Sequence, residues 1–307
     1  MHPRPSTFSI VARDPETDAV GIAVQSKFVA VGSVVPFAAA DAGAIATQSF
    51  ANVAYGPEGL DLLREGHDAE TVIDRLIESD EEAPSRQVGV VGQDGSVGAF
   101  TGEECFDHAS DRQGEHYTVQ GNILENRETI DAMAEAYERA DALPEGLLAA
   151  LHAGNEAGGD RRGEQSAAMY VAKPEGGYDG KNDRWIDVRV DDHEAPIDEL
   201  ERVFRLYDVT LLEREEPEEV VELSGETAEA VLETLAALDL YEGTPSETMG
   251  DAGREALEAF RGMNNFENHS LEVVEDAIAR GWEDAEGEGE ERLVDAVWHG
   301  LRRLDRV

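Results

Sequence analysis

Two apolar runs joined by a short polar segment open this chain, and they constrain its fold more than any other feature. The runs span Thr7–Ala12 and Val20–Ser26, and the polar segment between them is Arg13–Asp18. β-Branched residues on both sides of a polar turn are typical of a β-hairpin. Because apolar residues are nearly continuous in both runs, we expect two strands that are buried on both faces, in a central antiparallel sheet.

The register of this hairpin brings two reactive side chains to one end of the sheet. If Ala12 pairs with Val20 or Gly21 across the turn, Thr7 lies opposite residue 25 or 26, and Lys27 follows. The pattern therefore predicts a hydroxyl at the first residue of a buried strand and a lysine at the far end of the next strand.

The first 212 residues mix strands and helices in groups, which favours a layered α+β domain over alternating βαβ units. We expect four layers, with helices outside and two sheets inside. A further apolar run, Val29–Val35, precedes the next expected strand. The later strands expected are Ala44–Ser49, Gln87–Val91, Val97–Thr101, Tyr117–Gln120, Ser166–Ala172 and Trp185–Val190. The expected helices are Glu58–Arg64, Ala69–Ser79, Glu128–Ala140, Pro144–Ala157 and Pro196–Leu212.

A charged run with a proline, Glu213–Glu219, separates this region from an all-helical one. We place an acidic linker at residues 213–221 and a helical domain at 222–307, where apolar residues recur at helical spacing. The predicted domains are therefore 1–212 and 222–307.

The charge of the chain is strongly unbalanced. It holds 68 Asp and Glu against 25 Lys and Arg among 307 residues, a net charge of −43. Nucleic acids and anionic lipids recruit proteins through cations, so both are excluded as expected partners. An acidic, lysine-poor surface suits concentrated salt, which screens self-repulsion, and it predicts a melting temperature that rises with KCl.

Several site classes are excluded by what the sequence lacks. The single cysteine, Cys105, cannot form an intrachain disulfide, and the neighbouring acids Glu103 and Glu104 make it a poor nucleophile. Asp191-Asp192-His193 has no second histidine at ligand spacing, so it is interpreted as a helix-capping region, and neither a metal nor a cofactor is expected. No apolar window is long enough for a membrane span, and no signal peptide is evident, so we expect a cytoplasmic protein.

Thr7 and Lys27 together indicate one chemistry. In an N-terminal nucleophile, cleavage before a Thr, Ser or Cys frees an α-amine with a pKa near 8, which can take the proton of the hydroxyl. A nearby lysine lowers the pKa of that amine and stabilises negative charge on the oxygen. The alternative is that Thr7 is only a strand former and Lys27 a surface cation.

Three further segments carry candidate binding groups. In the glycine-rich segment 158–163, Gly159 lets the backbone approach a ligand, and Asp160 with Arg161 could orient one. The alternative is a helix-ending loop with its own ion pair. Asn52 and Asn122 stand at predicted strand ends, where an amide can donate to an oxyanion, although turn residues have the same composition.

These segments also resemble a known family, domain-of-unknown-function family 1028. The resemblance covers about residues 6–212, and the residues that carry it are Thr7–Pro15, Gly21–Phe28, Gln120–Asn122, Gly158–Ala167, Asn182–Arg184 and Asp187–His193. That family is grouped with the N-terminal nucleophile hydrolases, and the resemblance implies their αββα sandwich. Residues 222–302 more weakly resemble a peptidoglycan-binding helical module, through Leu235, Leu238, Tyr241–Gly243 and Ala256–Phe260.

The hypothesis is therefore an amidohydrolase that acts on a small amide or peptide-like bond. Its catalytic residues are predicted to be Thr7, Lys27, Asn52 and Asn122, and its substrate-binding residues Ser26, Gly159, Asp160 and Arg161. Six residues precede Thr7, so the Ser6–Thr7 bond must be cut before the amine exists. The rival is a non-catalytic binding protein, uncleaved, whose helical module recognises a glycan or a protein. Assembly into a homo-oligomer is left open.

Overall fold

The computed structural model describes residues 7–106 and 108–307, and it divides into two compact units. The first extends to Arg202 and the second from Val203 to Val307. The first unit has mixed α and β structure, and the second has helices alone. Both agree with the structural classes expected from the sequence, α+β for the first region and all-helical for the second.

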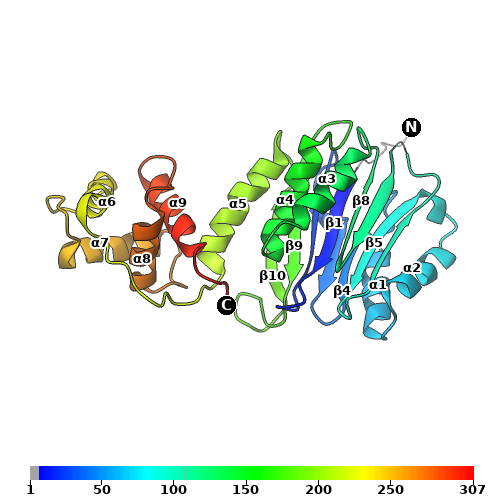
Figure 1. Ribbon diagram of the computed structural model, residues 1–307, viewed down its shortest axis with the longest axis horizontal. Coiled ribbons are helices and arrows are strands. Elements are labelled where there is room, and N and C mark those ends of the chain that lie inside the picture. Colours follow the sequence, from blue (N-terminus) through cyan, green and yellow to red (C-terminus); the bar gives the residue numbers. More distant parts are fainter. Residues whose placement is uncertain (1–6, 107) are drawn as a thin grey trace. The chain divides into compact units, whose positions relative to one another are not determined.

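Two antiparallel sheets form the centre of the first unit (Figure 1). The six-stranded sheet has the order β10-β9-β2-β1-β8-β7, and the four-stranded sheet has the order β3-β4-β5-β6. Their strands are β1 (Thr7–Arg13), β2 (Val20–Ser26), β3 (Pro36–Ala39), β4 (Gly43–Ser49), β5 (Arg86–Gly92), β6 (Val97–Thr101), β7 (Ser110–Gly114), β8 (Tyr117–Asn122), β9 (Ser166–Ala172) and β10 (Arg184–Val190).

Helices pack on both sheets. α1 (Tyr55–Arg64) and α2 (Ala69–Glu78) contact the four-stranded sheet, whereas α3 (Glu128–Tyr137) and α4 (Leu143–Glu156) contact the six-stranded sheet. The sheets also contact each other directly, because β1 lies against β4 and β5. Asp68 begins α2 by accepting a hydrogen bond from the Thr71 backbone N–H at 2.8 Å, the usual role of an aspartate N-cap.

The opening hairpin has the predicted register. Thr7 pairs with Ser26, and Arg13 pairs with Val20. On its other side, β1 pairs with β8, with Thr7 opposite Asn122, so β1 is an interior strand. The prediction of adjacent buried strands in a central sheet is confirmed.

Three segments differ from the sequence pattern, and one of them is β3 (Pro36–Ala39), a strand that was not expected. The apolar run Val29–Val35 forms no strand; it holds a short 3-10 helix, Val31–Ser33, which starts after Ala30 in the left-handed region at φ 55°. Conversely, β7 (Ser110–Gly114) is a strand without an apolar signal, because it is a partly exposed strand that pairs with β8 at the edge of the six-stranded sheet.

The second unit has one hydrophobic core. It contains the end of α5 (Pro196–Leu211), which crosses the unit boundary, and α6 (Gly225–Ala237), α7 (Gly250–Met263), α8 (Leu271–Gly281) and α9 (Glu290–Leu301). The division falls after Arg202 rather than at the acidic segment 213–221, because Val209 belongs to the core of the helical unit. Buried Asp208 also accepts hydrogen bonds from Arg214 and Arg306, within the same unit.

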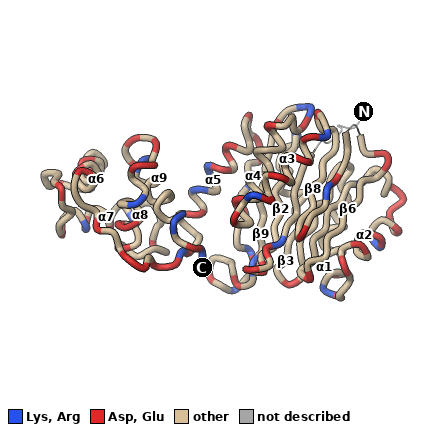
Figure 2. The backbone as a smooth tube through the Cα atoms, viewed as in Figure 1, with Lys and Arg blue, Asp and Glu red and all other residues tan. Residues whose placement is uncertain are grey.

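Acidic side chains are spread over both units (Figure 2). The acidic segment after α5 is itself tied to the helical unit, because the Val221 backbone N–H donates to Asp276 at 2.7 Å. Within the described ranges, no helix combines the length and the apolar character needed to cross a membrane.

Candidate functional site

Four polar side chains stand in one row across the six-stranded sheet. Thr7 in β1 pairs with Asn122 on one side and with Ser26 on the other, and Ser26 pairs in turn with Ser166 in β9. Directly opposed residues of antiparallel strands share a face. The Asn122 amide reaches Gln87 in β5, so the row faces the four-stranded sheet.

Thr7 is buried, with 3% of its surface exposed, and its hydroxyl has a defined partner. Thr7 Oγ1 donates to Ser26 Oγ at 3.1 Å. The Thr7 carbonyl oxygen accepts longer contacts from two amides, Gln48 Nε2 at 3.4 Å and Asn122 Nδ2 at 3.5 Å. Both the main chain and the side chain of Thr7 are therefore held in place.

Thr7 lines a pocket of about 520 Å³. One wall is apolar and comes from the segment after β2 and from Phe50; its residues are Phe28, Val31, Val34, Val35, Phe50 and Ala51. The remaining lining is polar or charged and consists of Thr7, Gln48, Ser49, Glu82 and Arg86. A mostly apolar pocket with a few converging polar groups is typical of a small-molecule site.

An ion-pair cluster contributes two charged residues, Glu82 and Arg86, to the lining of this pocket. Arg86 Nε donates to Asp80 at 2.9 Å, Arg86 Nη2 donates to Glu82 at 2.7 Å, and Arg86 Nη1 donates to the Phe50 carbonyl. The Arg86 hydrogen bond holds the pKa of Asp80 well below its usual range. Asp80 also accepts from Asn52 at 3.1 Å.

Between the two sheets, next to Thr7, buried side-chain amides of one sheet are hydrogen-bonded to side chains of the other. Ser9 Oγ donates to Gln48 Oε1 at 2.7 Å, and Gln120 Nε2 donates to Ser9 Oγ at 2.6 Å. Gln87 Oε1 accepts from Gln48 Nε2 at 2.9 Å and from Asn122 Nδ2 at 3.0 Å. These five side chains, Ser9, Gln48, Gln87, Gln120 and Asn122, are called the amide cluster below.

The predicted Lys27 contact with Thr7 is not seen. Lys27 follows Ser26 directly, as predicted, but its ammonium donates to the Glu164 carbonyl at 2.7 Å. In residues 7–106 and 108–307, no hydrogen bond joins Lys27 to Thr7. The cause is the turn after β2, where buried Asp160 accepts the Lys27 backbone N–H at 2.8 Å.

The glycine-rich segment lies apart from the Thr7 pocket lining. The Asp160 carboxylate is occupied by Lys27 and by the backbone and side chain of Arg162. The Arg161 side chain is largely exposed, with Glu125 4.0 Å from its Nε. Gly159 has φ 56°, and a Cβ there would approach Asn155 to 2.9 Å, so its position requires glycine for local packing.

The two predicted asparagines have different places. Asn52 donates to Asp80 beside the pocket, whereas Asn122 contacts the Thr7 carbonyl and belongs to the amide cluster. Gln48, Ser49 and Phe50 come from the polar strand-end segment that also holds Asn52, and they line the pocket together with Arg86, although none of the four was predicted as a site residue. Ser49 has φ 68°, uncommon for a residue other than glycine, and such backbone strain is concentrated at functional sites.

Cys105 lies beside this pocket, with Sγ 3.6 Å from Ser49 Oγ and 3.3 Å from the Arg86 carbonyl oxygen. Burial raises the pKa of its thiol. The expectation that Cys105 is a poor nucleophile is therefore supported, because the thiolate is the reactive form.

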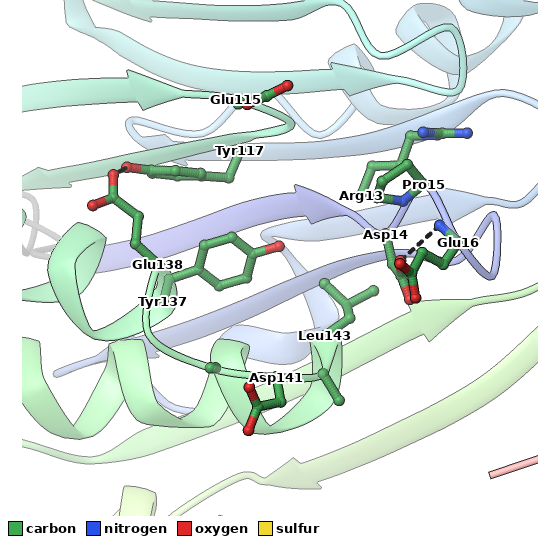
Figure 3. A pocket seen from close by; sticks show the side chains of 12 residues that line it. Arg13, Asp14, Pro15, Glu16, Glu115, Tyr117, Tyr137, Glu138, Asp141 and Leu143 are labelled. Carbon is green, nitrogen blue, oxygen red and sulfur yellow. Dashed lines mark hydrogen bonds between the residues drawn. The ribbon is translucent and has the colours of Figure 1, made fainter. Parts of the chain in front are cut away.

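A second pocket of about 520 Å³ lies at the Arg13 end of β1 (Figure 3). It is lined by Tyr117, Tyr137 and several carboxylates, and the Tyr117 hydroxyl donates to Glu138. Burial raises the pKa of Tyr117 to about 12. Its lining contains no Ser, Thr, Cys, His or Lys, and the described residues contain no cluster of three metal-ligating side chains. The Thr7 pocket is therefore the candidate site.

Comparisons with known proteins agree with this division of the chain. Residues 7–200 match the family of unknown function DUF1028, and residues 210–297 match a family described as "Putative peptidoglycan binding domain". The chain is 32% identical to protein SPO2555 from Silicibacter pomeroyi, whose crystal structure is assigned to DUF1028. That match has a TM-score of 0.61 and covers 66% of this chain and 86% of the other. A search of curated proteins found no match.

Proposed function

The chain belongs to the DUF1028 family, and from the geometry of its Thr7 pocket we propose that it is an N-terminal nucleophile amidohydrolase. Its substrate would be a small amide or peptide-like bond. One observation carries the proposal: the hydroxyl of Thr7, at the first residue of an interior strand, lines a mostly apolar pocket and has a hydroxyl partner in Ser26.

The arrangement of the layers supports the same class. Two facing antiparallel sheets with helices packed on each agree with the αββα sandwich that N-terminal nucleophile hydrolases share. In that class the nucleophile begins a central strand, which is the place of Thr7 in β1.

The chemistry follows from a free α-amine at Thr7. Cleavage of the Ser6–Thr7 bond would supply it, with a pKa near 8. The amine takes the hydroxyl proton as Oγ1 attacks the substrate carbonyl, and the C–N bond breaks when the proton passes to the leaving amine. Water then hydrolyses the Thr7 ester, which releases the acid and restores the hydroxyl.

The pocket lining indicates which part of the substrate is apolar. A wall suited to an alkyl or aryl acyl group is formed by Phe28, Phe50 and three valines of the segment after β2, which are Val31, Val34 and Val35. Because Arg86 is already paired with Asp80 and Glu82, we assign it to shaping the pocket rather than to binding a free carboxylate.

The other predicted residues have indirect roles in this proposal. Asp160 fixes the Lys27 backbone and so holds the turn beside Ser26. Lys27 remains the candidate for tuning the amine, which would require its ammonium to leave the Glu164 carbonyl. Of the two asparagines, Asn122 contacts the Thr7 carbonyl oxygen and is proposed to help hold Thr7, whereas Asn52 donates to Asp80 and is proposed to help hold that carboxylate. Gly159 and Arg161 are proposed to support the loop around Asp160.

The test is hydrolysis of N-acyl p-nitroanilides whose acyl groups range from acetyl to phenylacetyl. Wild-type protein should release p-nitroaniline, faster with the larger apolar acyl groups. Thr7→Ala should abolish turnover, and Thr7→Ser should retain part of it. Thr129→Ala is the matched control, since Thr129 is a buried threonine of α3 outside the pocket, and its hydroxyl donates to Asn126 rather than to the amide cluster. Undiminished hydrolysis by a folded Thr7→Ala variant would contradict the proposal.

The rival function, glycan or protein binding, is favoured by the match of residues 210–297 alone. It predicts that the full chain cosediments with insoluble peptidoglycan whether or not Thr7 is intact. Retention of residues 1–6 together with such binding would favour the rival over catalysis.

A further inference from the structure

We propose that Gln48 is a positioning residue that holds the Thr7 backbone for attack. The proposal rests on the hydrolase function above and extends it to a residue from the opposite sheet. Gln48, in β4, is the member of the amide cluster that both lines the Thr7 pocket and contacts Thr7.

The orientation of the Gln48 amide is determined by its neighbours. Its Oε1 accepts the Ser9 hydroxyl at 2.7 Å, so its Nε2 must face the other way. Nε2 then donates to Gln87 Oε1 at 2.9 Å and approaches the Thr7 carbonyl at 3.4 Å and the Gln120 carbonyl at 3.3 Å. A flipped amide would place its oxygen against these three acceptors, so only this orientation satisfies the cluster.

The contact matters because Thr7 is the first residue of its strand. A strand end is held on fewer sides than a strand interior, and small displacements of a reacting group cost large factors in rate. Gln48 adds a contact from the facing sheet at this point, while Asn122 adds one from the neighbouring strand. The Thr7 hydroxyl is thereby kept toward Ser26 and the pocket.

A second glutamine provides a matched control. Gln25 is as deeply buried as Gln48, but it lies on the other face of β2, because its neighbour Ser26 faces Thr7. Within the described residues, neither Gln25 amide atom has a hydrogen-bond partner. Replacing it removes the same chemical group without touching Thr7.

The experiment measures acylation of Thr7 by an alkyl β-lactone in the full chain. The Thr7 oxygen forms an ester with the lactone carbonyl, the ring C–O bond breaks, and the hydroxyl proton passes through the amine to the ring oxygen. Intact mass and peptide mapping give the rate at Thr7. We expect Gln48→Met to slow labelling about tenfold or more and Gln25→Met to stay within about twofold of wild type.

A pH series separates positioning from a merely structural role. In Gln48→Glu, the ionised carboxylate cannot donate to the Thr7 carbonyl, but the protonated acid can. The ratio of the variant rate to the wild-type rate should therefore rise as the pH falls. Should Gln48→Met prove unfolded by circular dichroism, Gln48→Glu alone decides the matter.

Each outcome has a defined meaning. Wild-type rates in folded Gln48 variants would overturn the positioning role and leave the hydrolase proposal standing. Equal slowing by Gln25→Met would show a general effect of buried substitutions and would also overturn it. Absence of wild-type labelling at Thr7 would overturn the hydrolase proposal and this inference with it.

Discussion

The space between the two sheets has two parts with different chemistry. The part called here the apolar region is filled by aliphatic side chains, among them Val11, Val20, Ile22, Ala44 and Val91. The other part is the amide cluster, which lies beside the Thr7 pocket. Both parts are fully buried, and both are built from the same two sheets.

The difference between the apolar region and the amide cluster indicates which buried residues serve the site rather than the stability of the fold. An apolar interior requires only matching volumes, whereas each buried amide requires a hydrogen-bond partner with correct geometry. Aliphatic residues could fill the cluster with equal or better stability. The amides therefore mark the part of the interior that is built for the site, and the following substitutions test this contrast in order of expected effect on the free energy of unfolding.

The largest effect is expected in the apolar region. Ile22→Ala deletes fully buried methyl and methylene groups and should lower the free energy of unfolding by about 2–5 kcal/mol in urea denaturation. Ile22→Val, the graded control, should cost about 0.5–1.5 kcal/mol. Thr7 labelling should persist in both folded variants; its loss would remove the distinction between the two regions.

A smaller loss is expected in the amide cluster. Gln48→Met conserves the shape of the side chain but leaves the Ser9 hydroxyl and the Gln87 side-chain oxygen, Oε1, each short of a partner. The free energy of unfolding should fall by about 1–3 kcal/mol, measured in the same urea series. Increased stability would indicate that the amides are not satisfied as described.

Gln25→Met should act in the opposite direction. The variant removes an amide that has no partner within the described ranges, so its desolvation cost disappears. We expect unchanged stability or a gain of about 1 kcal/mol. A loss of that size would reveal a hydrogen bond, for example to buried water, that resembles those of the amide cluster.

Thr7→Val should have the smallest effect on stability and the largest on chemistry. The change keeps the β-branched shape and removes the Thr7 hydroxyl, which donates to Ser26. The free energy of unfolding should change by about 1 kcal/mol or less, while β-lactone labelling at residue 7 disappears. A loss above about 3 kcal/mol would make Thr7 a structural residue.

The sequence predicts the local part of this architecture well. The Thr7–Ser26 register follows from one hairpin, because a short polar turn fixes the pairing of its strands. The expected strands Gln87–Val91, Val97–Thr101 and Ser166–Ala172 are likewise confirmed. Strand β7 was missed, since a polar edge strand has no apolar pattern to detect.

The candidate site is less predictable, because it depends on contacts between the sheets. Arg86 begins a strand far from Thr7 in the sequence, and only the packing of one sheet on the other brings both to one pocket. The direction of the Lys27 ammonium depends on a loop carbonyl at Glu164. A usable signal was present for Gln48: a fully buried polar residue in the strand Ala44–Ser49 requires an internal partner.

The most direct test of the central claim is the identity of the N-terminal residue of the purified full-length protein. For the wild-type protein, intact mass combined with N-terminal peptide mapping should show a chain that begins at Thr7 with a free α-amine. If Thr7 performs its own release, the Thr7→Ala variant should instead keep residues 1–6. Wild-type protein that labels or hydrolyses while residues 1–6 remain attached would contradict the free-amine mechanism. If wild-type protein keeps residues 1–6 and shows neither β-lactone labelling nor hydrolysis, that result would contradict catalysis at Thr7 altogether.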